Sequence, residues 1–218
     1  MADETPQTPP PQDPEDILGS TVRQFIHATA AKSPTPGGGS VAAVAGALAA
    51  SLAEMALQYT VGKKAFETHR EALVAAIDKL RKAAALMQEL VSEDIAAYSY
   101  LGGFLKVPAE QRAGHADYLS AVARAIRAPQ SVGGCALHIL EICDDLLDKT
   151  NPIIISDLGA AAAYARATVD AAEYSVLANL KLLPSAEEQV EHRRRAAEIS
   201  LRADVLYRKV RAHMNSVL

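Results

Sequence analysis

The 218-residue sequence contains no tryptophan, few other aromatic residues and only two cysteines, Cys135 and Cys143. Both cysteines fall in one predicted helix, about two turns apart. Thiols placed in this way are more typical of a helical core than of a disulfide framework. We therefore expect reduced thiols and a cytoplasmic protein.

The sequence also lacks a large excess of positive or negative charge: it has 22 lysines and arginines and 26 acidic residues, which give a net charge of −4. Nucleic-acid-binding proteins usually carry a basic face, and the sequence shows none. It shows no charged segment followed by an apolar run near its start, so we expect no secretion signal. The apolar run at 41–57 resembles a membrane span in length, but its alanine content and the polar Ser51, Glu54 and Gln58 on one side favour a helix buried in protein. We expect neither nucleic acid nor a membrane as a partner.

Alternating strand patterns are absent over any useful length, and the β-branched run at 153–155 is the only short candidate. Apolar residues instead recur in steps of three and four, as on one face of a helix. Half of the residues are hydrophobic, which fits one globular domain with a real core. We predict a disordered, proline-rich tail at 1–15 and a single all-α domain at 16–218, a bundle of about six or seven helices.

Prolines and caps predict several helix boundaries. A long helix is expected over 67–104, followed by a shorter, peripheral helix over 109–128. Pro129 suits the first turn of a helix, so a new helix is expected to begin there. Ser156 is predicted to cap the next helix, which Pro184 ends.

The stretch SPTPGGGS at 33–40 precedes the long apolar helix expected over 41–61. Its three glycines leave the backbone bare, so a ligand or another chain can come close. A bare loop before a helix N-terminus exposes unpaired N–H groups, which suit a carboxylate or another anion, and the last residue suits an N-cap. No lysine follows in P-loop position, so this is no Walker motif, and a plain tight turn is the alternative. The residues concerned are Gly37, Gly38, Gly39 and Ser40.

Two long apolar stripes each contain one polar residue. Asp94 interrupts the stripe over 67–104, and Asn179 interrupts a second stripe over 158–183. A lone buried carboxylate is costly unless it is paired or does chemistry. Asp94 and Asn179 therefore predict a small polar pocket in an apolar bundle, and Lys181 would add positive charge near this pocket. The alternatives are that Asp94 lies where the stripe has drifted to solvent, and that Lys181 lies on a solvated face.

Three blocks of this sequence, in the same order, resemble the C-terminal family of formiminotransferase-cyclodeaminase, which includes stand-alone methenyltetrahydrofolate cyclohydrolases. The blocks are PGGGSV at 36–41 with TVGKK at 60–64, EDIAAY at 93–98, and Asn151 through Ser156-Asp157 to NLK at 179–181. The resemblance covers about residues 25–183. The family often has Phe where this chain has Tyr98, and this change keeps an aromatic ring.

The resemblance implies an all-helical homodimer that binds tetrahydrofolate and acts on the one-carbon bridge between N5 and N10. One reaction of such proteins hydrolyses 5,10-methenyltetrahydrofolate to 10-formyltetrahydrofolate. The other closes 5-formimidoyltetrahydrofolate to the methenyl form and releases ammonia. We expect the cyclohydrolase, because the sequence holds no formiminotransferase domain to supply a formimidoyl group. A non-catalytic helical folate-binding or scaffolding module is the rival interpretation.

The resemblance also suggests roles for the polar residues of the three blocks. Asp94 is expected to carry the proton in either reaction, with Asp157 as a second candidate or a pterin anchor. The side chains that would bind the rest of the substrate are Asn151 and Asn179 on the pterin, and Lys63 and Lys64 on the glutamate tail, with the glycine loop adding N–H groups. The six histidines are scattered without ligand spacing, so we expect no metal and no cofactor beyond the folate itself.

Overall fold

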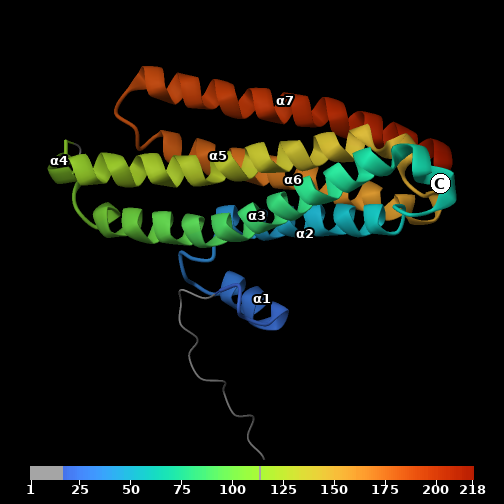
Figure 1. Ribbon diagram of the computed structural model, residues 1–218. Helices are drawn as coiled ribbons and strands as arrows, with labels where there is room; N and C mark the ends of the chain where they lie inside the picture. The colour runs from blue at the N-terminus through green and yellow to red at the C-terminus, as the bar shows by residue number, and fades with distance from the viewer. Residues whose placement is uncertain (1–16, 113) are drawn as a thin grey trace, which may run out of the picture.

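The computed structural model describes residues 17–112 and 114–218 as a bundle of helices (Figure 1). The predicted disordered tail at 1–15 lies outside the described residues. The described part of the chain contains no strand, and the predicted all-α class is confirmed. Its helices are α1 (Val22–Ala30), α2 (Gly38–Gln58), α3 (Arg70–Leu105), α4 (Ala109–Arg112), α5 (Ala116–Asp145), α6 (Ile155–Leu180) and α7 (Ala186–Val217), with 3-10 turns η1 (Lys64–His69), η2 (Leu147–Lys149) and η3 (Pro152–Ile154).

The five long helices lie side by side in two layers (Figure 1). α3, α5 and α7 form one layer, and α2 and α6 form the layer behind it. Small residues allow the close approach: a Cβ built on Gly46 of α2 would lie 2.9 Å from the sulfur of Met87 in α3 and 3.3 Å from Thr168 in α6. Alanines fill most of the remaining contact positions of α2. The centre of the bundle is therefore made by backbones that pack closely rather than by large side chains.

The outer side of the α2–α6 layer is apolar and partly uncovered. On α2, Leu48 is 61% exposed, and Val44 and Leu52 are half-buried on the same side. On α6, Tyr164 and Tyr174 are 52% and 69% exposed. By length and composition alone, α2 is the one helix in the described residues that would qualify as a membrane span, and half of that window is buried inside the bundle.

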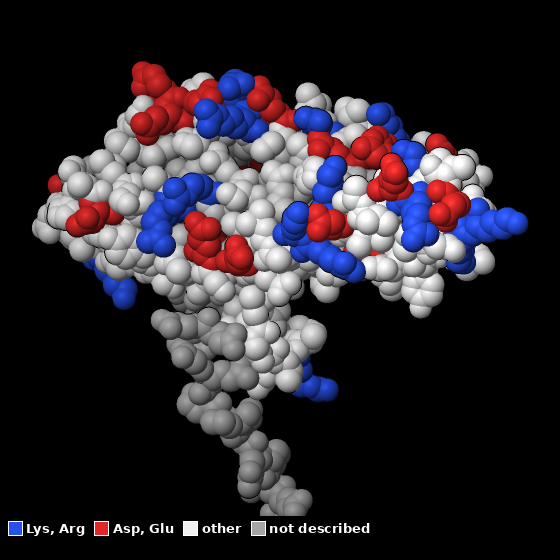
Figure 2. Space-filling view, viewed as in Figure 1, with Lys and Arg blue, Asp and Glu red and all other residues white. Residues whose placement is uncertain are grey.

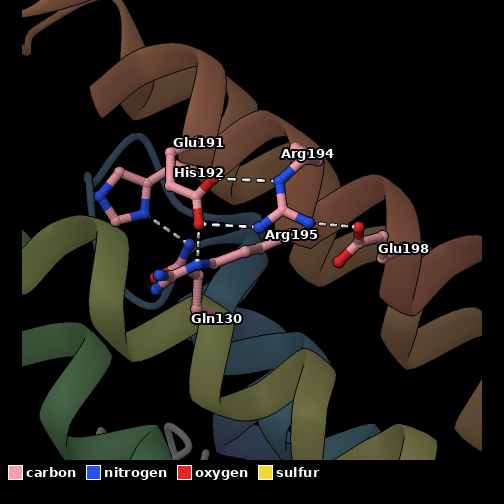
Figure 3. Close-up of polar contacts among 6 residues, drawn as sticks. All are labelled: Gln130, Glu191, His192, Arg194, Arg195 and Glu198. Atoms are coloured by element: carbon pink, nitrogen blue, oxygen red, sulfur yellow. Dashed lines mark hydrogen bonds and ion pairs between the residues drawn. The ribbon is translucent and has the colours of Figure 1, made fainter. Parts of the chain in front are cut away.

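The opposite face of the bundle is charged, and Figure 2 shows acidic and basic side chains interspersed over it. α7 is tied to α5 at this face by Glu141 with Arg202, and by a pair of Asp144 with Lys209 at 3.6 Å. Figure 3 shows other contacts near the start of α7. Glu191 accepts hydrogen bonds from Arg194 and Arg195, and Nε2 of Gln130 in α5 lies 2.7 Å from Nδ1 of His192. The two arginines lower the pKa of Glu191 to about 2. Exposed pairs of this kind contribute little stability each, so apolar contacts hold α7 in place.

The prediction that a helix begins at Pro129 is wrong, because α5 runs through this residue without a break. Residues 109–128 therefore do not form a separate helix: Ala109–Arg112 make the single turn α4, and α5 starts at Ala116. Pro129 is buried among its neighbours. Local rules place proline at a first turn, whereas the tertiary structure here accepts it in a helix interior.

Two predicted N-caps are also corrected. α2 begins at Gly38 with Gly37 as its N-cap, and Ser40 lies in the first turn, where its hydroxyl accepts the N–H of Gly37 at 3.0 Å. α6 begins at Ile155, so Ser156 lies within it, and the nearby side-chain cap is made by Asn151 on η3. In both places the chain turns into the helix slightly earlier than the serine indicates.

Candidate active site

A cavity of about 220 Å³ lies beside the N-terminus of α2. The glycine loop forms one wall, and α3 and α6 form the others. The structure thus brings Asp94 and Asn179, the polar residues of the two apolar stripes, to the same cavity as the glycine loop. Its lining residues are Pro34, Thr35, Gly37, Gly38, Gly39, Asp94, Tyr98, Ser175, Ala178 and Asn179.

The carboxyl group of Asp94 lies directly against Gly39. A Cβ built on Gly39 would lie 2.6 Å from the carboxyl carbon and 2.8 Å from Oδ2, which is closer than real Cβ atoms come. The neighbouring Ser40 is fully buried, and its backbone N–H and hydroxyl lie close enough to lower the pKa of this carboxyl, while the hydroxyl also donates to the Gly37 carbonyl at 3.1 Å. These donors belong to the first turn of α2, where N–H groups have no helical acceptor. Asp94 therefore faces the glycine loop, and the alternative that it simply points into solvent is wrong.

Burial raises the pKa of the Asp94 carboxyl above its ordinary value, and the hydrogen bonds from Ser40 offset only part of this rise. Desolvation disfavours the charged form, while donors to the carboxylate favour it. A carboxyl group whose pKa is moved toward neutrality exchanges a proton more readily at physiological pH. The arrangement is suited to accepting a proton and returning it.

Asn179 of α6 also lines the cavity, and a hydrogen bond to α5 holds its side chain. Its Nδ2 donates to the backbone carbonyl of Ala125 at 2.9 Å. Within the described part of the chain its Oδ1 has no hydrogen-bond partner, and it does not belong to the buried unpaired polar atoms. This oxygen is therefore accessible and can accept a hydrogen bond from a ligand.

Four of the predicted site residues lie at the other end of the bundle: Lys63, Lys64, Asp157 and Asn151. Lys63 and Lys64 follow the C-terminal end of α2, and Asp157 lies in the first turn of α6, whose last turn carries Asn179. A helix as long as α2 spans about 30 Å. The two lysines are exposed, and Asp157 is half-buried. Within one chain these residues do not share a cavity with Asp94.

Asn151, the fourth of these residues, has its hydrogen bonds taken by the chain itself. Its N–H donates to Thr60 Oγ1 at 3.1 Å, and its Nδ2 reaches the carbonyl of Tyr59 at 3.4 Å. Its Oδ1 accepts the N–H of Ile153 at 3.2 Å. These contacts join the end of α2 to η3, so Asn151 is used for structure rather than left free for a ligand.

Lys181 and Ser175 depart from the predicted site in opposite ways. Lys181 caps the C-terminal end of α6 and is exposed, and it does not line the cavity. Ser175, which the sequence analysis missed, does line it, and its Oγ would lie 3.6 Å from a Cβ on Gly38. The one available signal was spacing, because Ser175 stands one helical turn before Asn179.

Two other hollows are larger, but neither is bordered by the glycine loop. One of about 270 Å³ lies between α5, α6 and α7, and one of about 420 Å³ lies between α3 and α5 and is lined in part by Cys135. Burial raises the pKa of Cys135 to about 11 and that of Cys143 to about 12, so both remain thiols. Among the described residues no three His, Cys, Asp or Glu side chains gather as metal ligands would. The glycine-loop cavity is the best candidate site.

Comparison with known proteins identifies relatives that cover most of the chain. The family model described as formiminotransferase-cyclodeaminase matches residues 21–198. The methenyltetrahydrofolate cyclohydrolase of Methylorubrum extorquens is 27% identical over 203 residues, which are 89% of this chain and 98% of that protein. The formimidoyltransferase-cyclodeaminase of Rattus norvegicus is 30% identical over 171 residues, 77% of this chain. This chain spans only 32% of the rat protein's length.

A solved structure agrees with the fold. The crystal structure of formiminotetrahydrofolate cyclodeaminase from Thermotoga maritima superimposes with a TM-score of 0.86, covering 93% of this chain and 99% of that chain. Its sequence identity is 22%, so this likeness concerns the fold alone. Together with the family match over residues 21–198, the helical architecture and the three sequence blocks show that the chain belongs to the formiminotransferase-cyclodeaminase family.

Proposed function

We propose that this chain is a folate one-carbon enzyme that hydrolyses 5,10-methenyltetrahydrofolate to 10-formyltetrahydrofolate. The observation that carries the proposal is the Asp94 carboxyl group, half-buried against Gly39 at the N-terminus of α2, with its pKa raised. A carboxylate so placed can stabilise a cation and also take up a proton. The family match supports the substrate class.

The methenyl substrate is a cation, and its bridging carbon lies between N5 and N10. Water attacks this carbon, and Asp94 accepts the proton that the water loses. The tetrahedral intermediate then collapses by breaking its bond to N5, which takes a proton from Asp94, while the carbinol proton leaves. The Oδ1 of Asn179 binds a donor of the pteridine ring, and the amides of the glycine loop remain available to an acceptor.

The second candidate is the formimidoyltetrahydrofolate cyclodeaminase reaction, which the rat relative's name favours. There N10 attacks the amidine carbon and loses its proton, and the departing nitrogen is protonated before it leaves as ammonia. One carboxyl group that accepts a proton and returns it serves this path as well. The site chemistry is therefore shared, and the substrate decides between the two.

Assays with both substrates distinguish the candidates. We expect loss of methenyl absorbance with formation of the 10-formyl compound, and little ammonia from the formimidoyl compound. Ammonia release without hydrolysis of the methenyl compound would overturn this choice. Folate binding, seen as a thermal shift, without turnover of either compound would indicate a non-catalytic folate-binding module.

We further propose a homodimer that joins through the uncovered α2–α6 face. This face exposes Leu48, Tyr164 and Tyr174, so a second copy would bury apolar surface. A two-fold axis across the helices would place the Lys63–Lys64 end of one copy beside the Asp94 cavity of the other. The exposed lysines could then hold the glutamate tail of a folate bound in the partner's cavity.

Mixing two inactive variants tests this arrangement. Asp94→Asn and the double variant Lys63→Glu, Lys64→Glu should each be inactive or nearly so at low substrate concentration. When equal amounts are unfolded and refolded together, activity should return to about a quarter of the wild-type value, because half of the dimers would hold one intact site of two. No recovery in a mixture that forms heterodimers would contradict a site shared between copies.

A further inference from the structure

Pro129 occupies a position from which α-helices normally exclude proline. It is buried within α5, which continues on both sides of it. Proline has no backbone N–H, so the carbonyl of Ala125, four residues earlier, loses the donor that the helix would otherwise provide. A buried carbonyl without a donor is unfavourable, and a partner must come from outside the helix.

Asn179 of α6 is that partner, because its Nδ2 donates to the Ala125 carbonyl at 2.9 Å. A carbonyl oxygen only accepts hydrogen bonds, so the amide must turn its NH₂ group toward α5. This orientation leaves Oδ1 as the atom that Asn179 can offer to the cavity it lines. With an N–H at position 129, the carbonyl would be satisfied within α5, and the amide would be free to turn either way.

We propose that Pro129 is a positioning residue, which leaves the Ala125 carbonyl open and so fixes Asn179 as a hydrogen-bond acceptor toward the ligand. The inference rests on the proposed function for the ligand's identity and adds which part of it Asn179 meets. An acceptor recognises an N–H donor of a pteridine, such as its amino group or a ring N–H, and not its carbonyl. Because Asp94 also lines the cavity, it presents acceptors from both α3 and α6.

Pro129→Ala tests this positioning because it restores the missing N–H. Alanine is the better helix former, so we expect the melting temperature to rise. We also expect KM for the methenyl substrate to rise by about two- to threefold, with kcat little changed, because an amide that is free to turn presents Oδ1 to the ligand only part of the time. If Pro129 served only the stability of the helix, Pro129→Ala would change the melting temperature and leave KM unchanged. A more stable protein that binds substrate less well therefore indicates a positioning role.

Two further variants make the test specific. Gly134→Ala strengthens the same helix, meets nothing within 4 Å and leaves the Ala125 carbonyl unchanged, so it should raise the melting temperature without changing KM. In an Asn179→Ala background, Pro129→Ala should add no further increase in KM. A wild-type KM in Pro129→Ala, or an equal increase in the Asn179→Ala background, would overturn the proposal.

A spectroscopic measurement needs no substrate. In ¹⁵N-labelled protein, the side-chain NH₂ of Asn179 should exchange slowly in the wild type and rapidly in Pro129→Ala. This outcome supports the positioning even for a protein that turns over no folate, so it separates this inference from the proposed function. Should Pro129→Ala not fold, Asn179→Asp replaces it: a carboxylate cannot donate to Ala125, and an unchanged melting temperature would contradict the bond.

Discussion

Two polar residues from other elements lie beside the two ends of α2, and their surroundings differ. At the N-terminal end, Asp94 of α3 lies beside Ser40, burial raises its pKa, and it borders a cavity. At the C-terminal end, Asn151 is equally out of place in an apolar bundle, but Thr60, Tyr59 and Ile153 take up its hydrogen-bonding groups. A polar group satisfied by its own chain holds structure together, whereas one left partly unsatisfied beside a cavity is available to a ligand.

The strongest test of this contrast is Asp94→Asn. The amide keeps the shape of the side chain and cannot carry the proton, so turnover should fall by about 10²-fold or more. Glu93→Gln is the matched control, because Glu93 is the adjacent carboxylate and only approaches Arg127, at 4.0 Å, on the outside. Steady-state kinetics of both variants measure the difference, and near-normal turnover in Asp94→Asn would remove Asp94 from the mechanism.

Gly39→Ala should have the next largest effect. The added Cβ would overlap the Asp94 carboxyl and displace it, so we expect turnover to fall by about tenfold or more. Gly38→Ala is the control, since its Cβ would meet only Ser175 Oγ at an ordinary 3.6 Å. If kcat falls equally in both variants, loop flexibility rather than the Asp94 contact determines activity.

The raised pKa of Asp94 predicts opposite effects of pH on activity and stability. Activity should decline as pH falls through this pKa, because the base becomes protonated. A group whose pKa is higher in the folded state stabilises the fold below its unfolded pKa of about 3.8, and this contribution is lost as pH rises through the folded value. Asp94→Asn should therefore gain more stability over the wild type at pH 7 than at pH 4 in urea unfolding, and equal gains would contradict the shift.

Asn151→Ala should affect activity least. It removes the contacts that join α2 to η3, so the free energy of unfolding should fall by about 1–3 kcal/mol. Activity per folded molecule, measured well below the melting temperature, should remain close to the wild-type value. A large loss of kcat in a fully folded variant would move Asn151 from the structural group to the functional one.

The sequence was most informative where a residue contradicted its surroundings. Asp94 and Asn179 interrupt apolar stripes, and this local conflict was enough to indicate a pocket between their helices. The loop at 33–40 was recognisable because its prolines disfavour a helix, while its glycines tolerate backbone conformations that other residues avoid. The fold class followed in the same way from helical periodicity.

Other features required the three-dimensional arrangement. Lys63, Lys64 and Asp157 belong to the same sequence blocks as the cavity residues, yet helix length places them far from Asp94 in one chain. Pro129 obeyed the local rule for a helix start, and only the Asn179 amide, 50 residues later in sequence, shows how its missing donor is offset. Such contacts depend on packing between elements, which periodicity does not specify.

The alanines at the centre of the bundle have a consequence for motion. Alanine has no side-chain rotamers to lose, so the contact between α2 and its neighbours forms at little cost in side-chain entropy and leaves few internal degrees of freedom. The first turn of α2, which carries Gly39 and Ser40, is therefore anchored to a stiff support. The walls beside Asp94 are set before a ligand arrives, and the energy of binding need not be spent on ordering them.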